Sequence, residues 1–173
     1  MTTRRTWPAW AAFCWGLIFG GLNLYWSLGG EFLLDHLAES IQKDVESGST
    51  SLLVLNTLGG LGKIAAGLLA LGTIASWGRA LPRRVHLVLL AGGGAMILLY
   101  GMANWVQMLL VELGAVDVPV SIGEAQVRWY LFLWEPAWII GGVLFLLTAE
   151  MYRRALRTGG ARHRPSWRGS KGR

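Results

Sequence analysis

Apolar residues dominate four stretches of the chain, and each stretch is long enough to cross a membrane. A bilayer core needs about 20 helical residues, and backbone groups in lipid must pair within their own segment. The pattern therefore predicts an all-α polytopic membrane protein, a four-helix transmembrane bundle. The predicted spans cover about residues 7–28, 58–77 (or from residue 51), 85–111 and 129–151.

The segment between the first two stretches has a different pattern. Its apolar residues recur at helical spacing, and its charged residues occupy the other positions. This predicts a short extracytoplasmic amphipathic helix over about residues 31–46, ended by Gly48. Such a helix would cover the end of the bundle, and binding of a partner is the alternative. Its apolar positions are Leu33, Leu34, Leu37, Ile41 and Val45.

Charge divides the polar segments into two groups. Arginines and a lysine gather before residue 7, at residues 79–84 and in residues 153–173, whereas the segments 31–46 and 112–124 are acidic. Because basic residues stay in the cytoplasm, we expect both termini inside and the acidic loops outside, in the cytoplasmic (inner) membrane. Residues 1–157 would form one membrane domain, and residues 158–173 a basic disordered cytoplasmic tail. This distribution explains the net charge of +6 without a nucleic-acid partner.

Composition supports the membrane class and narrows the chemistry. The chain is 53% hydrophobic and holds ten tryptophans, a residue that favours the membrane–water boundary. The single cysteine, Cys14, excludes an internal disulfide, and the three histidines lack the spacing of a zinc or haem site. We therefore expect no metal and no cofactor.

Polar residues within the apolar stretches fall at one depth. Counting at 1.5 Å per residue places one polar residue of each span roughly 8–10 Å below the outer interface. This predicts a polar layer inside the bundle, extended by Gln107 on the face of Asn104 and by Arg128 on the face of Glu135. The candidate binding residues are Asn23, Lys63, Asn104, Gln107, Arg128 and Glu135.

Lys63 and Glu135 are the strongest signal in this set. A charge deep in a span costs about 2.5–3.5 kcal/mol, and pairing the two would offset much of that cost. Such a pair could simply fix the register of two helices, or it could line a binding or transport site. Pro136 should disturb the fourth helix beside Glu135. Gly16 and Gly20 form a small-xxx-small pair suited to close helix contact.

Three function classes follow from this layer. The first is binding or passage of a small molecule or lipid, with Arg128 as an anion contact at the mouth. The second is a structural or accessory subunit that packs on a larger membrane protein. A lipid-modifying membrane enzyme is disfavoured, because the sequence has none of the usual hydrolase, metalloprotease or phosphate-binding motifs.

Two motifs resemble a known bacterial family. They are Tyr25–Gly30 (YWSLGG) and Arg128–Pro136 (RWYLFLWEP), the latter followed by Gly141 and Gly142. Together they resemble the domain of unknown function 3995 family, small four-span membrane proteins common in actinobacteria. The resemblance implies the fold and no established activity. It also implies a histidine where this chain has Asn23, so a proton-transfer role for that histidine would be lost here.

Overall fold

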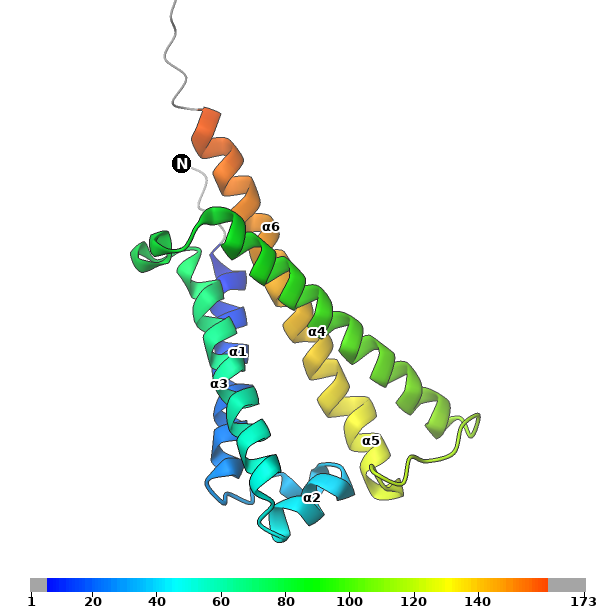
Figure 1. Cartoon of the computed structure of the whole chain (residues 1–173). Helices are drawn as coiled ribbons and strands as arrows, with labels where there is room; N and C mark the ends of the chain where they lie inside the picture. The colour runs from blue at the N-terminus through cyan, green and yellow to red at the C-terminus, as the bar shows by residue number, and fades with distance from the viewer. Residues whose placement is uncertain (1–5, 162–173) are drawn as a thin grey trace, which may run out of the picture.

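The computed structural model describes residues 6–161, and these form helices and turns without a strand. Two long helical hairpins, α1 with α3 and α4 with α6, make up most of the fold (Figure 1). The α-helices are α1 (Trp7–Ser27), α2 (Glu39–Glu46), α3 (Thr50–Gly72), α4 (Arg83–Glu112), α5 (Val127–Trp129) and α6 (Glu135–Ala161). Three short 3-10 helices are η1 (Leu34–His36), η2 (Ser76–Ala80) and η3 (Glu124–Gln126), and η4 (Tyr130–Trp134) is a π-helical turn.

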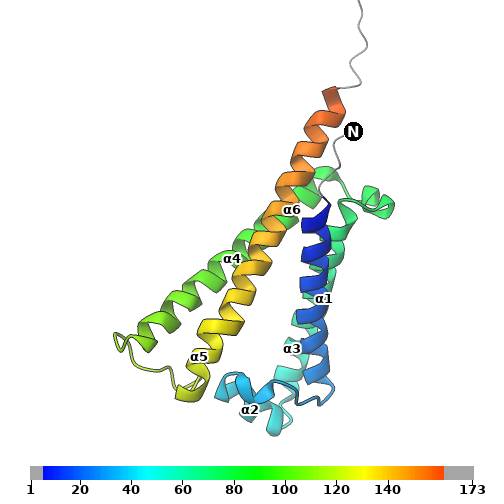
Figure 2. The ribbon, with the colours of Figure 1, turned by 180° about the vertical axis from the view of Figure 1, so that it is seen from behind.

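The two ends of the fold differ in charge. We call the end with residues 28–49 and 113–126 the acidic end, and the end with residues 73–82 the basic end. The hairpins meet at the basic end and diverge toward the acidic end, so that α3 and α4 separate (Figures 1 and 2). Contact between the hairpins runs mainly through α1 and α6.

Glycines let α1 and α3 approach until their backbones touch. A Cβ on Gly16 would lie 2.5 Å from the carbonyl oxygen of Lys63, and one on Gly20 would lie 2.6 Å from that of Gly60. On the facing helix, a Cβ on Gly67 would lie 3.1 Å from the carbonyl oxygen of Phe13. The close contact expected of Gly16 and Gly20 is confirmed.

The hairpin of α4 and α6 uses the same device. A Cβ on Gly142 would lie 2.5 Å from the backbone nitrogen of Leu98. A Cβ on Gly94 would lie 2.9 Å from that of Phe145, and a Cβ on Gly101 would lie 2.9 Å from that of Trp138, both on α6. Small residues at these crossings let the helix backbones approach closely. The resulting van der Waals contact can hold helices together even in apolar surroundings.

Trp15 joins the two hairpins. It is 6% exposed, packs on Phe145 and Trp138 with ring centroids 5.8 Å apart in each case, and donates from Nε1 to the Ala137 carbonyl at 2.7 Å. Gly141 provides the space for the indole ring, since a Cβ there would lie 2.3 Å from it. Residues from all four long helices complete this core, namely Ala12, Ala70, Leu90, Phe145 and Ala149.

Three helical stretches are long and apolar enough to cross a membrane: Leu53–Gly72, Arg83–Glu112 and Glu124–Thr158. The helix α1 has 21 residues but is not among them, because its tryptophans, glycines and Asn23 lower its mean hydropathy. The second predicted span ends about a turn and a half too late, at residue 77 instead of Gly72, whereas its alternative start at residue 51 agrees with the helix. Its helix begins at Thr50 and ends at Gly72, where the η2 turn folds back and Gly78 packs on the Gly72 backbone.

The predicted amphipathic helix over residues 31–46 is wrong in its extent. The segment forms the turn η1 and the separate helix α2, with extended backbone at Leu37 and Ala38 between them. Leu37 and Ala38 are buried against the rest of the fold, and this burial accompanies the break in the helix. Gly48 does follow the end of α2, with a positive φ of 66°.

The predicted start of the tail is also wrong. The helix α6 continues through Ala161, past the expected boundary at residue 157. Glu150 sustains this last part by pairing with Arg153 and Arg154, one turn further along. The remainder of the predicted tail lies outside the described residues.

A set of hydrogen bonds, which we call the strap, ties the two loops of the acidic end together. The amides of Glu39 and Ser40 donate to the carbonyls of Ile122 and Ser121, both at 3.1 Å. Trp134 donates from Nε1 to the His36 carbonyl at 2.8 Å. The strap holds η1 and α2 to the loop at residues 121–122 and to η4. Figure 2 shows α2 and α5 near one another at this end of the fold.

Candidate functional site

Two asparagines link α1 and α3 near the acidic end. The amide of Asn23 donates to Asn56 Oδ1, and Asn56 Nδ2 donates back to the Asn23 backbone carbonyl at 3.2 Å. This reciprocal pair leaves Asn23 Oδ1 free to accept from a third group. It therefore presents one oriented oxygen between the helices.

Lys63 supplies that third group. Its Nζ donates to Asn23 Oδ1 at 2.6 Å and lies 5.0 Å from the centroid of the Trp138 ring on α6. The Lys63 carbonyl lies opposite Gly16, about 10 Å further from the acidic end than Asn23. The backbones of Lys63 and Asn23 therefore do not share a level, and the lysine side chain extends along the helix so that its ammonium reaches the asparagines.

Glu135 does not pair with Lys63. No carboxylate lies within ion-pair distance of the lysine among the described residues, so the ion pair considered from the sequence is not formed. Glu135 is 2% exposed, and its Oε2 is buried without a hydrogen-bond partner.

Trp138 stands between the lysine and the tyrosine of the facing hairpin. Lys63 of α3 lies over one part of its ring, and Tyr100 of α4 packs against it with centroids 5.5 Å apart. Tyr100 is nonetheless 55% exposed. These three side chains therefore mark the place where α3 and α4 separate over α6.

The helix before Glu135 departs from α-helical geometry because of Pro136. A proline nitrogen cannot donate, so the Phe132 carbonyl four residues earlier loses its α-helical partner. The Glu135 amide donates to the Tyr130 carbonyl instead of to Leu131, so the Leu131 carbonyl also lacks its α-helical partner. The chain responds with the π-helical turn η4, and the Trp105 indole of α4 donates to the Leu131 carbonyl at 3.0 Å. The expected disturbance at Pro136 thus takes the form of a wider turn that is satisfied from the neighbouring helix.

Two predicted site residues of α4 do not reach the layer as expected. Asn104 is half-buried and donates to the carbonyl of Tyr100 in its own helix at 2.9 Å. Gln107 is exposed. Since the hairpins diverge, the α4 face that carries these amides is not enclosed by α3.

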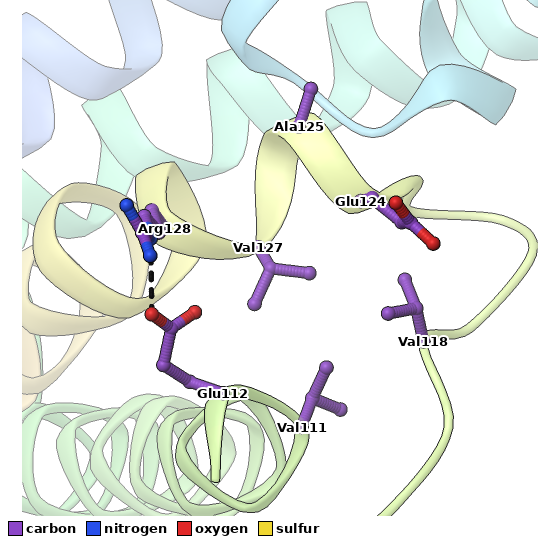
Figure 3. A pocket seen from close by; sticks show the side chains of 7 residues that line it. All are labelled: Val111, Glu112, Val118, Glu124, Ala125, Val127 and Arg128. Carbon is purple, nitrogen blue, oxygen red and sulfur yellow. Dashed lines mark hydrogen bonds and ion pairs between the residues drawn. The ribbon is translucent and has the colours of Figure 1, made fainter. Parts of the chain in front are cut away.

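Arg128 is not a contact at the mouth of the layer. Its Nε donates to Glu112 Oε1 at 3.0 Å, at the acidic-end surface (Figure 3). The pair borders a surface pocket of about 720 Å³ (Figure 3). The other lining residues include Glu124, Val111, Val118 and Val127. Arg128 is exposed, whereas Glu135, seven residues later and beyond the π-helical turn η4, is buried. The shared inward face expected from their spacing is therefore wrong.

His86 is a buried polar residue that sequence reasoning missed. It is fully buried at the basic end, with Nε2 2.7 Å from the Leu69 carbonyl of α3 and its ring 5.2 Å from that of Tyr152 on α6. The sequence did hold a signal for its burial: His86, Leu90 and Gly94 are spaced four residues apart and so share one face of α4. Within residues 6–161 no three His, Cys, Asp or Glu side chains gather as a metal site would require.

Known proteins give a family and nothing more specific. The family model described as "Protein of unknown function (DUF3995)" matches residues 16–145, about three quarters of the chain. The match extends from α1 into α6 and includes Asn23, Lys63, Trp138 and Glu135. No curated protein and no solved structure matches the chain. The chain belongs to the DUF3995 family of proteins of unknown function.

Proposed function

We propose that this protein crosses the membrane four times, with both termini in the cytoplasm, and binds an amphipathic molecule between its two hairpins. The polar groups around Lys63 would hold the head of the molecule, and the apolar helices its tail. The site consists of Asn23, Asn56, Lys63, Tyr100, Glu135 and Trp138. The function is binding or passage rather than catalysis.

The observation that carries this proposal is the state of the Lys63 ammonium. It is held by Asn23 and Trp138 and has no carboxylate partner within residues 6–161, although Glu135 is buried in the same part of the fold. A purely structural pair would have joined the two charges, since each is costly to bury alone. An ammonium without a carboxylate partner and a buried carboxyl oxygen without a hydrogen bond, both within the described residues, indicate a site that a bound molecule completes.

The four-span topology makes a labelling prediction. With Cys14 replaced by alanine, Ser47→Cys at the acidic end should react with a membrane-impermeant maleimide in intact cells. Ala80→Cys at the basic end should react only after permeabilisation, and an N-terminal epitope tag should resist external protease. These outcomes follow from basic segments staying inside. External cleavage of the tag would mean that α1 does not cross the membrane.

The site makes a second prediction. Protein purified from membranes in mild detergent should retain a small molecule or lipid that mass spectrometry detects. Lys63→Met should reduce its occupancy by about tenfold, equivalent to about 1.4 kcal/mol, the scale of one charge-assisted hydrogen bond. Lys43→Met, which removes an exposed lysine paired with Glu39, is the matched control and should change nothing.

The same preparation tests the accessory-subunit alternative. Equal retention of all small molecules by wild type and Lys63→Met would contradict a binding site at Lys63. Stoichiometric co-purification of one membrane protein, unaffected by Lys63→Met, would then favour an accessory role. The size of the purified species by gel filtration separates these two results.

A further inference from the structure

We propose that the bound molecule is a lipid with an anionic headgroup, which enters sideways from the bilayer between α3 and α4. This inference rests on the proposed function and names its ligand class. The argument uses the charge and free donors of Lys63, the access to it, and the surfaces that flank it.

The headgroup charge follows from Lys63. A lysine ammonium has three N–H donors, and the structure gives one of them a partner, Asn23 Oδ1 at 2.6 Å. The nearest aromatic face, Trp138, stabilises the cation without neutralising it. Within residues 6–161 the other two donors have no protein partner, and they remain for a phosphate or carboxylate oxygen.

The site is also rigid before any ligand binds. Asn56 fixes Asn23 by two hydrogen bonds, and Asn23 fixes the ammonium. Close packing of Gly20 on Gly60 holds the two helices that carry these side chains. A preorganised cation of this kind lowers the entropy lost on binding.

The route of entry follows from comparing the acidic end of the fold with the side between α3 and α4. At the acidic end, the strap joins the loops, and the hollow beside Asn56 has a volume of only about 90 Å³. That space holds about three waters at roughly 30 Å³ each, far less than a lipid headgroup with its glycerol. The side between α3 and α4 is different, because these helices diverge toward the acidic end (Figure 1). Tyr100 of α4, which packs on the same Trp138 ring as Lys63, is 55% exposed.

Exposed apolar side chains on α4 suit acyl chains. On α4, Met96 is 69% exposed one helical turn from Tyr100 and on the same face, and Leu99 beside Tyr100 is 67% exposed. An amphiphile can therefore keep its chains along this helix while its headgroup reaches the lysine. A fully water-soluble anion would lose that apolar contact.

The test compares headgroups on the delipidated full-length protein. Binding of phosphatidylglycerol, phosphatidylcholine and glycerol phosphate is measured by native mass spectrometry, with identical acyl chains on the two lipids. We expect phosphatidylglycerol to bind about tenfold more tightly than phosphatidylcholine, and glycerol phosphate not to compete. Lys63→Met should remove this preference, and Lys63→Arg should retain it, which also shows that the site tolerates substitution.

A control addresses the arginines of the basic end, which attract anionic lipids at the surface. The double variant Arg83→Gln with Arg84→Gln should keep the preference. Loss of the preference in this variant and not in Lys63→Met would overturn the inference. So would equal binding of both lipids, although Lys63-dependent binding of both would leave the proposed function standing. Competition by glycerol phosphate would identify a soluble anion, and no Lys63-dependent binding would overturn both proposals.

Discussion

Gly20→Ala should destabilise the protein strongly, whereas Gly21→Ala, one residue along the same helix, should not. A methyl group on Gly20 would lie 2.6 Å from both the Gly60 carbonyl oxygen and Ile64 Cγ1. The first of these is backbone and cannot move without separating α1 from α3. Overpacking of this kind costs about 1–3 kcal/mol or more.

Gly21 is the matched control because, its own helix backbone and chain neighbours aside, no atom of the described residues lies within 4 Å of the position that its Cβ would take. Alanine there should leave stability unchanged or raise it by about 0.5–1 kcal/mol, through its better helix propensity. Thermal unfolding in one detergent, followed by circular dichroism, measures both variants. Equal midpoints for the two variants would show that α1 and α3 do not meet at Gly20.

Glu135→Leu should stabilise the protein. The carboxyl group is 2% exposed and has a buried oxygen without a hydrogen-bond partner, which costs about 1–3 kcal/mol in the folded state. Leucine has a similar size and removes that cost. Glu135→Gln keeps an unsatisfied polar group and should leave the unfolding midpoint close to that of wild type.

This ranking separates a functional acid from a structural one. If Glu135 held the bundle together through a pair, its replacement by leucine would strand a buried partner and cost about 3–5 kcal/mol. A lower midpoint for Glu135→Leu than for Glu135→Gln would therefore contradict the geometry described for α6. Glu46→Leu, at the exposed end of α2, controls for a general effect of added apolar surface.

Helix content was predictable because the apolar stretches are long and uniform. The fourth helix, however, begins as separate turns, since the sequence does not reveal how the carbonyls freed before Pro136 are satisfied. Here the donor is Trp105, a residue of another helix. The break at Leu37 and Ala38 has the same origin, because tertiary burial of these two residues overrides the helical period of their segment.

The candidate site was predictable only in part. Asn23 and Lys63 were found because polar residues in apolar stretches are conspicuous, and the structure joins them. Their relation to Glu135 depends on helix rotation and on the divergence of the hairpins, which residue spacing does not determine. Trp138 was missed because a tryptophan among apolar residues carries no polar signal, although its ring position makes it the centre of the site.

The most direct test of the site between the hairpins is photocrosslinking from position 100. Replacing Tyr100 with p-benzoylphenylalanine puts a photoreactive ring beside Trp138 while the protein remains in its native membrane. After irradiation, mass spectrometry should find an anionic lipid attached at this position, and Lys63→Met in the same chain should abolish the adduct. An adduct to another protein, or a lipid adduct that Lys63→Met leaves unchanged, would contradict a lipid site at Lys63.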